Sequence, residues 1–106
     1  MTQFVLIQSH TPDMCPIASE RARKAYGPDP GPLMGLAQKL GVKLLAGPMA
    51  SLDHRTFVVM ESPTADAVRD FVIQSGLVQW NTTEVIPVAG MESMLKEMAS
   101  TKPVHP

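Results

Sequence analysis

The sequence predicts a small α+β domain of the ferredoxin-like βαββαβ type, with a four-stranded antiparallel sheet and a short C-terminal helix. Three observations predict this class. The chain has 106 residues, which is room for one domain. Short segments rich in β-branched and aromatic residues alternate with segments of helical periodicity. Two of the β-rich segments follow each other across a short turn, as in the hairpin of the split βαβ motif.

In the first half of the chain, residues 3–10 are β-rich, and the proline-containing run that follows ends the strand. Residues 17–26 favour a helix, for which Ser19 is a possible N-terminal cap. The Pro/Gly segment 27–32 then breaks that helix. A second, main crossover helix ends at Gly41, and its apolar residues recur at helical spacing: Leu33, Leu36, Ala37 and Leu40.

In the second half, residues 42–49 and 54–61 read as two strands of a hairpin, joined by a turn at 51–53 in which Asp53 has a structural role. A helix beginning near Pro63 and ending at Gly76 follows. Residues 80–88 supply the fourth strand. Four apolar residues then mark a short C-terminal helix: Met91, Met94, Leu95 and Met98. We expect one domain over 1–100 and a frayed tail over 101–106.

Composition narrows the function classes. The chain is 44% hydrophobic and 18% charged with a net charge of -1, which argues against a disordered tail and against a basic nucleic-acid binder. Its apolar runs are far shorter than the ~20 residues of a membrane-spanning helix. The single cysteine, Cys15, forms no internal disulfide and fits a reducing compartment. We therefore expect a cytoplasmic protein with no nucleic-acid and no membrane partner.

The topology predicts where the chemically capable side chains gather. In the split βαβ motif the first strand lies between the third and fourth and runs antiparallel to both. The end of the first strand and the beginnings of the other two therefore share one rim of the sheet. His10, His54 and Trp80 fall at that rim, and the loop that carries Cys15 leaves from it.

Alternation of side chains along the strands predicts two different faces. One is apolar and suited to the helices: Val5, Ile7, Phe57, Val59 and Val85. The other is mixed: Gln8, His10, His54, Thr56, Trp80, Thr82 and Glu84. No predicted helix remains to cover the mixed face except the C-terminal one. We therefore expect a homodimer in which a second copy covers it, leaving a polar cavity for a small-molecule ligand.

Imidazole nitrogen and thiolate sulfur are ligands for transition metals, and three of them leave room for water, a substrate or a fourth protein group. The sequence thus predicts a divalent transition-metal site of His10, Cys15 and His54, holding nickel, zinc or copper. Met14 and Glu84 are candidate additional ligands, and Trp80 is a candidate pocket residue. The ordinary alternatives are polar strand ends for the histidines, a buried apolar role for Cys15, a solvated or paired charge for Glu84, and packing for Trp80.

Two stretches resemble a known family. The run Glu61–Val68, ESPTADAV, and the later run Thr83–Val88, TEVIPV, resemble small uncharacterised bacterial ferredoxin-like proteins that include a nickel-binding member. The resemblance covers the second half of the chain. It implies a dimer of ferredoxin-like domains, a dimeric α+β barrel, with metal held by His and other side chains near the sheet. The chain departs from that pattern at Phe71–Gln74, where the family often carries a His, and its segment 10–16 has no clear counterpart.

The chain also resembles the broader superfamily of dimeric α+β barrels, which contains cofactor-free oxygenases and isomerases. This resemblance implies an alternative function. In that alternative the chain is a small enzyme that binds an organic substrate over the mixed face and uses His10 or His54 as general base. A third reading is a binding module without chemistry, for which both histidines are dispensable.

Overall fold

The computed structural model describes residues 1–26 and 31–106. Its elements in chain order are β1 (Thr2–Ser9), the 3-10 turn η1 (Pro12–Met14), α1 (Glu20–Tyr26), α2 (Gly31–Leu40), β2 (Lys43–Ala50), β3 (Arg55–Ser62), α3 (Ala65–Gln74), the 3-10 turn η2 (Leu77–Gln79), β4 (Thr82–Val88) and α4 (Met91–Ser100). Four of the six residues of the predicted Pro/Gly break, 27–30, lie outside the described residues, and α2 begins at its fifth, Gly31.

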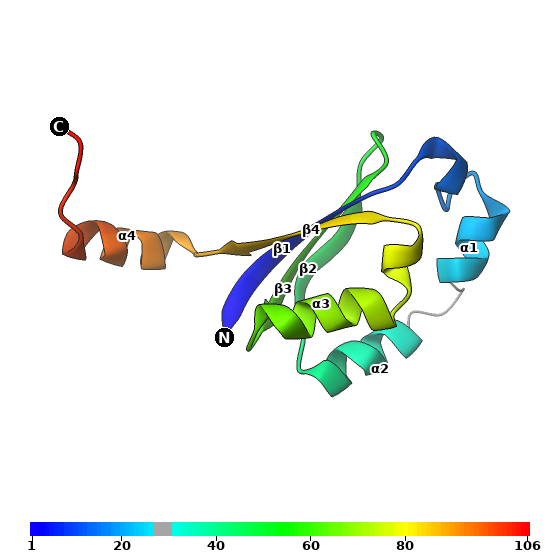
Figure 1. Cartoon of the computed structure of the whole chain (residues 1–106), viewed down its shortest axis with the longest axis horizontal. Helices are drawn as coiled ribbons and strands as arrows, with labels where there is room; N and C mark the ends of the chain where they lie inside the picture. Colours follow the sequence, from blue (N-terminus) through cyan, green and yellow to red (C-terminus); the bar gives the residue numbers. More distant parts are fainter. Residues whose placement is uncertain (27–30) are drawn as a thin grey trace.

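The four strands form one antiparallel sheet in the order β2-β3-β1-β4. The predicted position of β1, between β3 and β4, is confirmed, and so is the β2–β3 hairpin. The α+β class is therefore right. The arrangement fits a ferredoxin-like fold in part, because the first connection carries two helices, α1 and α2, and a further helix, α4, follows the last strand (Figure 1).

Local sequence explains where the helices begin and end. Thr64 caps α3, its side chain accepting a hydrogen bond from the backbone N–H of Ala67. Ser19 likewise accepts from the N–H of Ala22 at the start of α1. Gly41 and Gly76 follow α2 and α3 with φ of 75° and 81°, the left-handed conformation that glycine adopts without strain. None of the helices in residues 1–26 and 31–106 is long and apolar enough to cross a membrane.

The core lies between one face of the sheet and the helices α2 and α3 (Figure 1). Phe4 and Leu6 of β1 and Met60 of β3 are its innermost strand residues, each at most 3% exposed. Across from them pack the buried side chains of the two helices, Ala37, Val68, Phe71 and Val72.

The predicted assignment of the two faces is wrong. Val5, Ile7, Phe57 and Val59 are only partly buried, and they lie on the face away from α2 and α3. Val85 is paired with Leu6 and so belongs to the helix side. The physical reason is that residues 4–7 and 57–60 are apolar without interruption. In such runs the alternation of side chains does not indicate which residues face the helices. The polar residues Gln8 and His10 therefore suggest the face away from the helices, whereas the structure places them on the helix side.

The other face of the sheet is uncovered within this chain, and α4 projects away from the rest of the molecule (Figure 1). Every residue of α4 is exposed, including the apolar stripe of Met91, Met94, Leu95 and Met98. The molecule is accordingly elongated, with principal extents of 54 × 31 × 18 Å. An open apolar sheet face and an unburied apolar helix therefore occur together in one short chain.

Candidate metal centre

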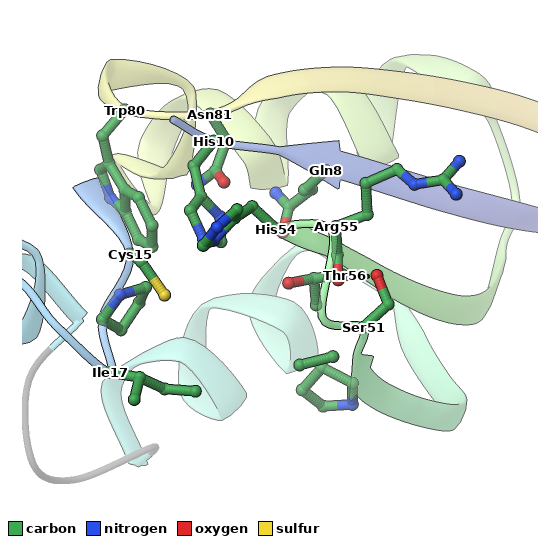
Figure 2. Close-up of a pocket in the computed structure, with 13 residues that line it drawn as sticks. Gln8, His10, Cys15, Ile17, Ser51, His54, Arg55, Thr56, Trp80 and Asn81 are labelled. Atoms are coloured by element: carbon green, nitrogen blue, oxygen red, sulfur yellow. Dashed lines mark hydrogen bonds between the residues drawn. The ribbon is translucent and has the colours of Figure 1, made fainter. Parts of the chain in front are cut away.

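The structure brings His10, Cys15 and His54 together at one end of the sheet, as predicted (Figure 2). One ligand atom from each, a ring nitrogen or the Sγ, lies within 4.8 Å of the other two. Three atoms so spaced lie within about 2.8 Å of a common point, compared with the ~2.0–2.3 Å of zinc–nitrogen and zinc–sulfur bonds. A contraction of well under 1 Å per ligand would close the site on an ion.

His10 follows the last residue of β1 and continues its pairing, since its backbone N–H donates to the carbonyl of His54 at 3.1 Å. Its side chain lies on the helix side of the sheet, in alternation with Gln8. Both ring nitrogens are buried, and neither has a hydrogen-bond partner among the residues that the structure describes. A buried polar atom without a partner costs about 1–3 kcal/mol, so this imidazole is poised for a ligand.

His54 is the last residue of the loop 51–54 that joins β2 to β3. The N–H of Ser51 donates to the carbonyl of Arg55 at 2.8 Å, which leaves three residues, 52–54, in the turn. Such loops commonly end in a left-handed residue, for which glycine is preferred. Here the left-handed residue is His54, with φ of 62°. A histidine thus occupies a position whose backbone favours a smaller residue, and its ring lies 5.4 Å from that of His10.

Cys15 comes from a tightly bonded loop between β1 and α1. Its N–H donates to the carbonyl of Pro12, and its own carbonyl accepts from the N–H groups of Ala18 and Ser19. Arg23 of α1 holds the next residues, donating to the carbonyls of Pro16 at 2.7 Å and Ile17 at 2.6 Å. Cys15 is 8% exposed and lies outside the main core. Its position is therefore fixed by the loop.

The three side chains line a cavity of about 250 Å³ (Figure 2). Its wall is mainly apolar, from Pro16, Ile17, Pro48, Ala50 and the ring of Trp80, with polar groups from Gln8, Ser51, Arg55, Thr56 and Asn81. No Asp or Glu is among the described residues that line it. The cavity combines soft and borderline metal ligands with space for a further small molecule.

The structure places the candidate additional ligands, Met14 and Glu84, and the candidate pocket residue Trp80 differently. Trp80 lines the cavity, with its ring 5.9 Å from that of His10, and it also packs against the core, so the pocket and packing interpretations both apply. Met14 is partly buried in η1 but does not line the cavity. Glu84 is paired with Ile7, on the opposite face of the sheet from Gln8. The prediction that Glu84 shares a face with His10 is therefore wrong.

Of the two charged residues at the hairpin, Arg55 lines the cavity and Asp53 does not. Asp53 is paired with Arg55 at 2.6 Å and accepts a hydrogen bond from the Ser51 hydroxyl. The hydrogen bond from Arg55, with that from Ser51, holds the pKa of Asp53 below its usual value, and the pairing raises the pKa of Arg55. Asp53 thus stabilises the turn that carries His54, as predicted. A hydrogen bond from the Thr11 side chain lowers the pKa of Asp13 near the Cys15 loop.

Several residues of the site were not singled out from the sequence. Gln8 is the clearest case: it is 3% exposed and lines the cavity, and its signal was a polar residue ending an otherwise apolar strand run. Pro48 and Arg23 had no such signal, because their roles depend on the tertiary path of β2 and of the Cys15 loop.

No protein-family model matches the chain, and no curated protein matches it at a significant level. The site's chemistry is therefore the basis for any functional assignment.

Proposed function

We propose that this chain is a transition-metal-binding protein whose His10, Cys15 and His54 hold one divalent ion. The observation that carries the proposal is the convergence of three ligand atoms, from three separate segments, within 4.8 Å of one another. The buried ring nitrogens of His10 have no hydrogen-bond partner in the described part of the chain. Two imidazoles and one thiolate suit zinc, nickel and copper, and the resemblance noted above adds weight to nickel. Three protein ligands leave the fourth coordination position of a tetrahedral ion open.

The proposal is tested by metal analysis of the full chain purified without an affinity tag. We expect uptake of one equivalent of zinc, nickel or copper on titration. His10→Ala, Cys15→Ser and His54→Ala should each weaken binding at least a hundredfold, because each removes a ligand. His105→Ala, in the exposed C-terminal segment, should leave the affinity unchanged. Uptake below a tenth of an equivalent, or equal effects of His54→Ala and His105→Ala, would refute the site.

Glu84→Gln serves as a second control, because Glu84 lies on the far face of the sheet. We expect it to bind metal as the unchanged chain does. A loss of affinity comparable with that of Cys15→Ser would mean that the ligand set is wrong.

A second candidate function is favoured by the cavity itself. In it the chain is a small enzyme, and His10 or His54 acts as general base on an organic substrate held in the cavity beside Trp80, on the helix side of the sheet instead of the face first expected. Turnover that survives exhaustive chelation would favour this candidate over the metal site.

We also propose that the chain functions as a homodimer in the cytoplasm. The support is the open apolar face of the sheet, together with the exposed apolar stripe of α4. Packing both against a second copy would remove these two apolar surfaces from water, as in a dimeric α+β barrel built from ferredoxin-like domains. A free thiolate ligand is in keeping with a reducing compartment.

A further inference from the structure

Gln8 presents an unused hydrogen-bond donor to the cavity. Gln8 is 3% exposed, and within residues 1–26 and 31–106 its buried amide nitrogen has no hydrogen-bond partner. In Figure 2 its amide end points toward the imidazoles of His10 and His54. Leaving an amide donor unpaired in a protein interior is costly, so the position favours a bound group that offers an acceptor atom.

A second, smaller cavity adjoins the first. It has a volume of about 130 Å³ and lies between the sheet and the helices, and Gln8 and Pro48 line both cavities. Except for Gln8, its walls are apolar: Leu6, Leu33, Met34, Leu44, Pro48, Val58, Met60, Phe71 and Leu77. A molecule held at Gln8 by a polar head would therefore find apolar surface for a short hydrocarbon tail.

The charge of the metal centre indicates which polar head group the cavity would bind. A divalent ion bound by two neutral imidazoles and one thiolate keeps a net charge of about +1. No carboxylate lines the described walls of either cavity to neutralise it. A monoanion that offers two acceptor atoms would satisfy both the ion and the Gln8 donor.

We propose that the paired cavities bind a small apolar monocarboxylate. One carboxylate oxygen takes the open position of the ion, the other accepts a hydrogen bond from Gln8, and the hydrocarbon chain runs into the second cavity. This inference rests on the proposed metal site, because the ion supplies the opposite charge.

The test is a calorimetric titration of the zinc-loaded full chain with acetate, butyrate, hexanoate and octanoate. Each added methylene that enters the apolar cavity should tighten binding about three- to fourfold, until the chain exceeds the space. Hexan-1-ol, which has the tail but not the charge, should bind at least tenfold more weakly than hexanoate. Hexanoate binding no tighter than acetate would overturn the proposal, and so would equal binding of hexanoate and hexan-1-ol.

A variant isolates the role of Gln8. Gln8→Met keeps the length of the side chain and removes the donor, so hexanoate should bind at least tenfold more weakly while zinc stoichiometry and affinity stay unchanged. Gln3→Met, on the exposed end of the same strand and the opposite face, should have no effect. The metal-free Gln8→Met chain should unfold at the same temperature as the unchanged chain, or higher, because an unpaired polar group is removed.

The outcomes separate this proposal from the one on which it depends. A chain that takes up none of zinc, nickel and copper overturns both. A chain that takes up one zinc but shows no chain-length dependence overturns only the carboxylate site. A markedly lower unfolding temperature for metal-free Gln8→Met would show that Gln8 serves the fold, for example by pairing with the Thr83 hydroxyl opposite it, and would also overturn the assignment.

Discussion

At the scale of single residues, the candidate metal centre is the place where the chain departs from what its fold alone favours. His54 occupies a left-handed position at φ of 62°, and His10 and Gln8 bury polar nitrogens without partners. Each feature costs of order 1–3 kcal/mol by itself. Local costs of this kind gather at functional sites, where a bound group repays them. The three features lie around one cavity, which supports a common cause.

The strain at His54 gives a prediction for stability. His54→Gly and His54→Ala should both lose metal binding, but the metal-free glycine variant should be about 1 kcal/mol more stable than the alanine variant, because glycine adopts a positive φ freely. Urea unfolding of the metal-free chains measures the difference. Equal stabilities would mean that the loop relaxes and that His54 carries no strain.

The sequence predicts the three ligand candidates because the strand directions bring the two histidines to one rim and the loop that carries Cys15 leaves from that rim. His10 follows β1, and His54 precedes β3, so the antiparallel pairing of these strands makes them neighbours. Gln8 was missed as a site residue for a physical reason: burial depends on which face of the sheet the helices cover. The continuous apolar run 4–7 left that choice undetermined.

At the scale of elements, three connections position the site. The end of β1 supplies His10, the β2–β3 hairpin supplies His54, and the loop before α1 supplies Cys15. The sequence predicted the strands and most helix boundaries well, because prolines, glycines and caps mark them. It did not predict η2, which carries the buried Leu77, or the irregular pairing of β2, where register shifts occur between Leu44 and Met49. Those features arise from tertiary packing.

The connection before α1 yields a second prediction. Arg23 is the side chain that fixes Pro16 and Ile17 beside Cys15. Arg23→Ala should loosen this loop and weaken metal binding about three- to tenfold. This factor corresponds to the net free energy of about one or two hydrogen bonds. Competitive titration with a chromophoric chelator measures the change. The matched control is Arg21→Ala on the same helix, which should bind as the unchanged chain does; identical affinities of the two variants would mean that the loop is held by its backbone alone.

The irregular β2 yields a third prediction. Gly47 has φ of 88°, and a Cβ there would lie 2.7 Å from the carbonyl oxygen of Phe57. Gly47→Ala should therefore destabilise the chain by about 2 kcal/mol or more, since strain and a backbone clash combine. Gly35→Ala, at an exposed position of α2 with open space around it, should be neutral or stabilising. Urea unfolding of both variants tests the contrast, and a neutral Gly47→Ala would contradict it.

At the scale of the whole molecule, the candidate metal centre and the apolar surfaces available to a second copy lie in different places. The metal centre lies at the end of the sheet near α1, whereas α4 projects from the other end (Figure 1). The open sheet face and α4 are the surfaces available for a second copy. Both were visible as apolar patterns in the sequence, but which face stays open was assigned wrongly, because a monomer sequence with two apolar faces does not say which one the helices cover.

The proposed dimer is tested by sedimentation equilibrium. We expect a mass twice the 11.5 kDa of one chain. Leu95→Glu, which places a charge on the apolar stripe of α4, should weaken the dimer at least tenfold, because a buried unpaired charge is costly. Lys96→Glu introduces the same residue one position along, at an exposed site paired only with Glu92, and should leave the dimer intact. A monomeric unchanged chain at micromolar concentration would contradict the dimer.

The central claim is that one divalent ion is held by two imidazoles and one thiolate at the end of β1. X-ray absorption spectroscopy of the chain loaded with one equivalent of zinc measures that ligand set directly. We predict one sulfur at about 2.3 Å and two imidazole nitrogens at about 2.0 Å, with the sulfur contribution lost in Cys15→Ser. A zinc shell of nitrogen and oxygen alone in the unchanged chain would contradict the account.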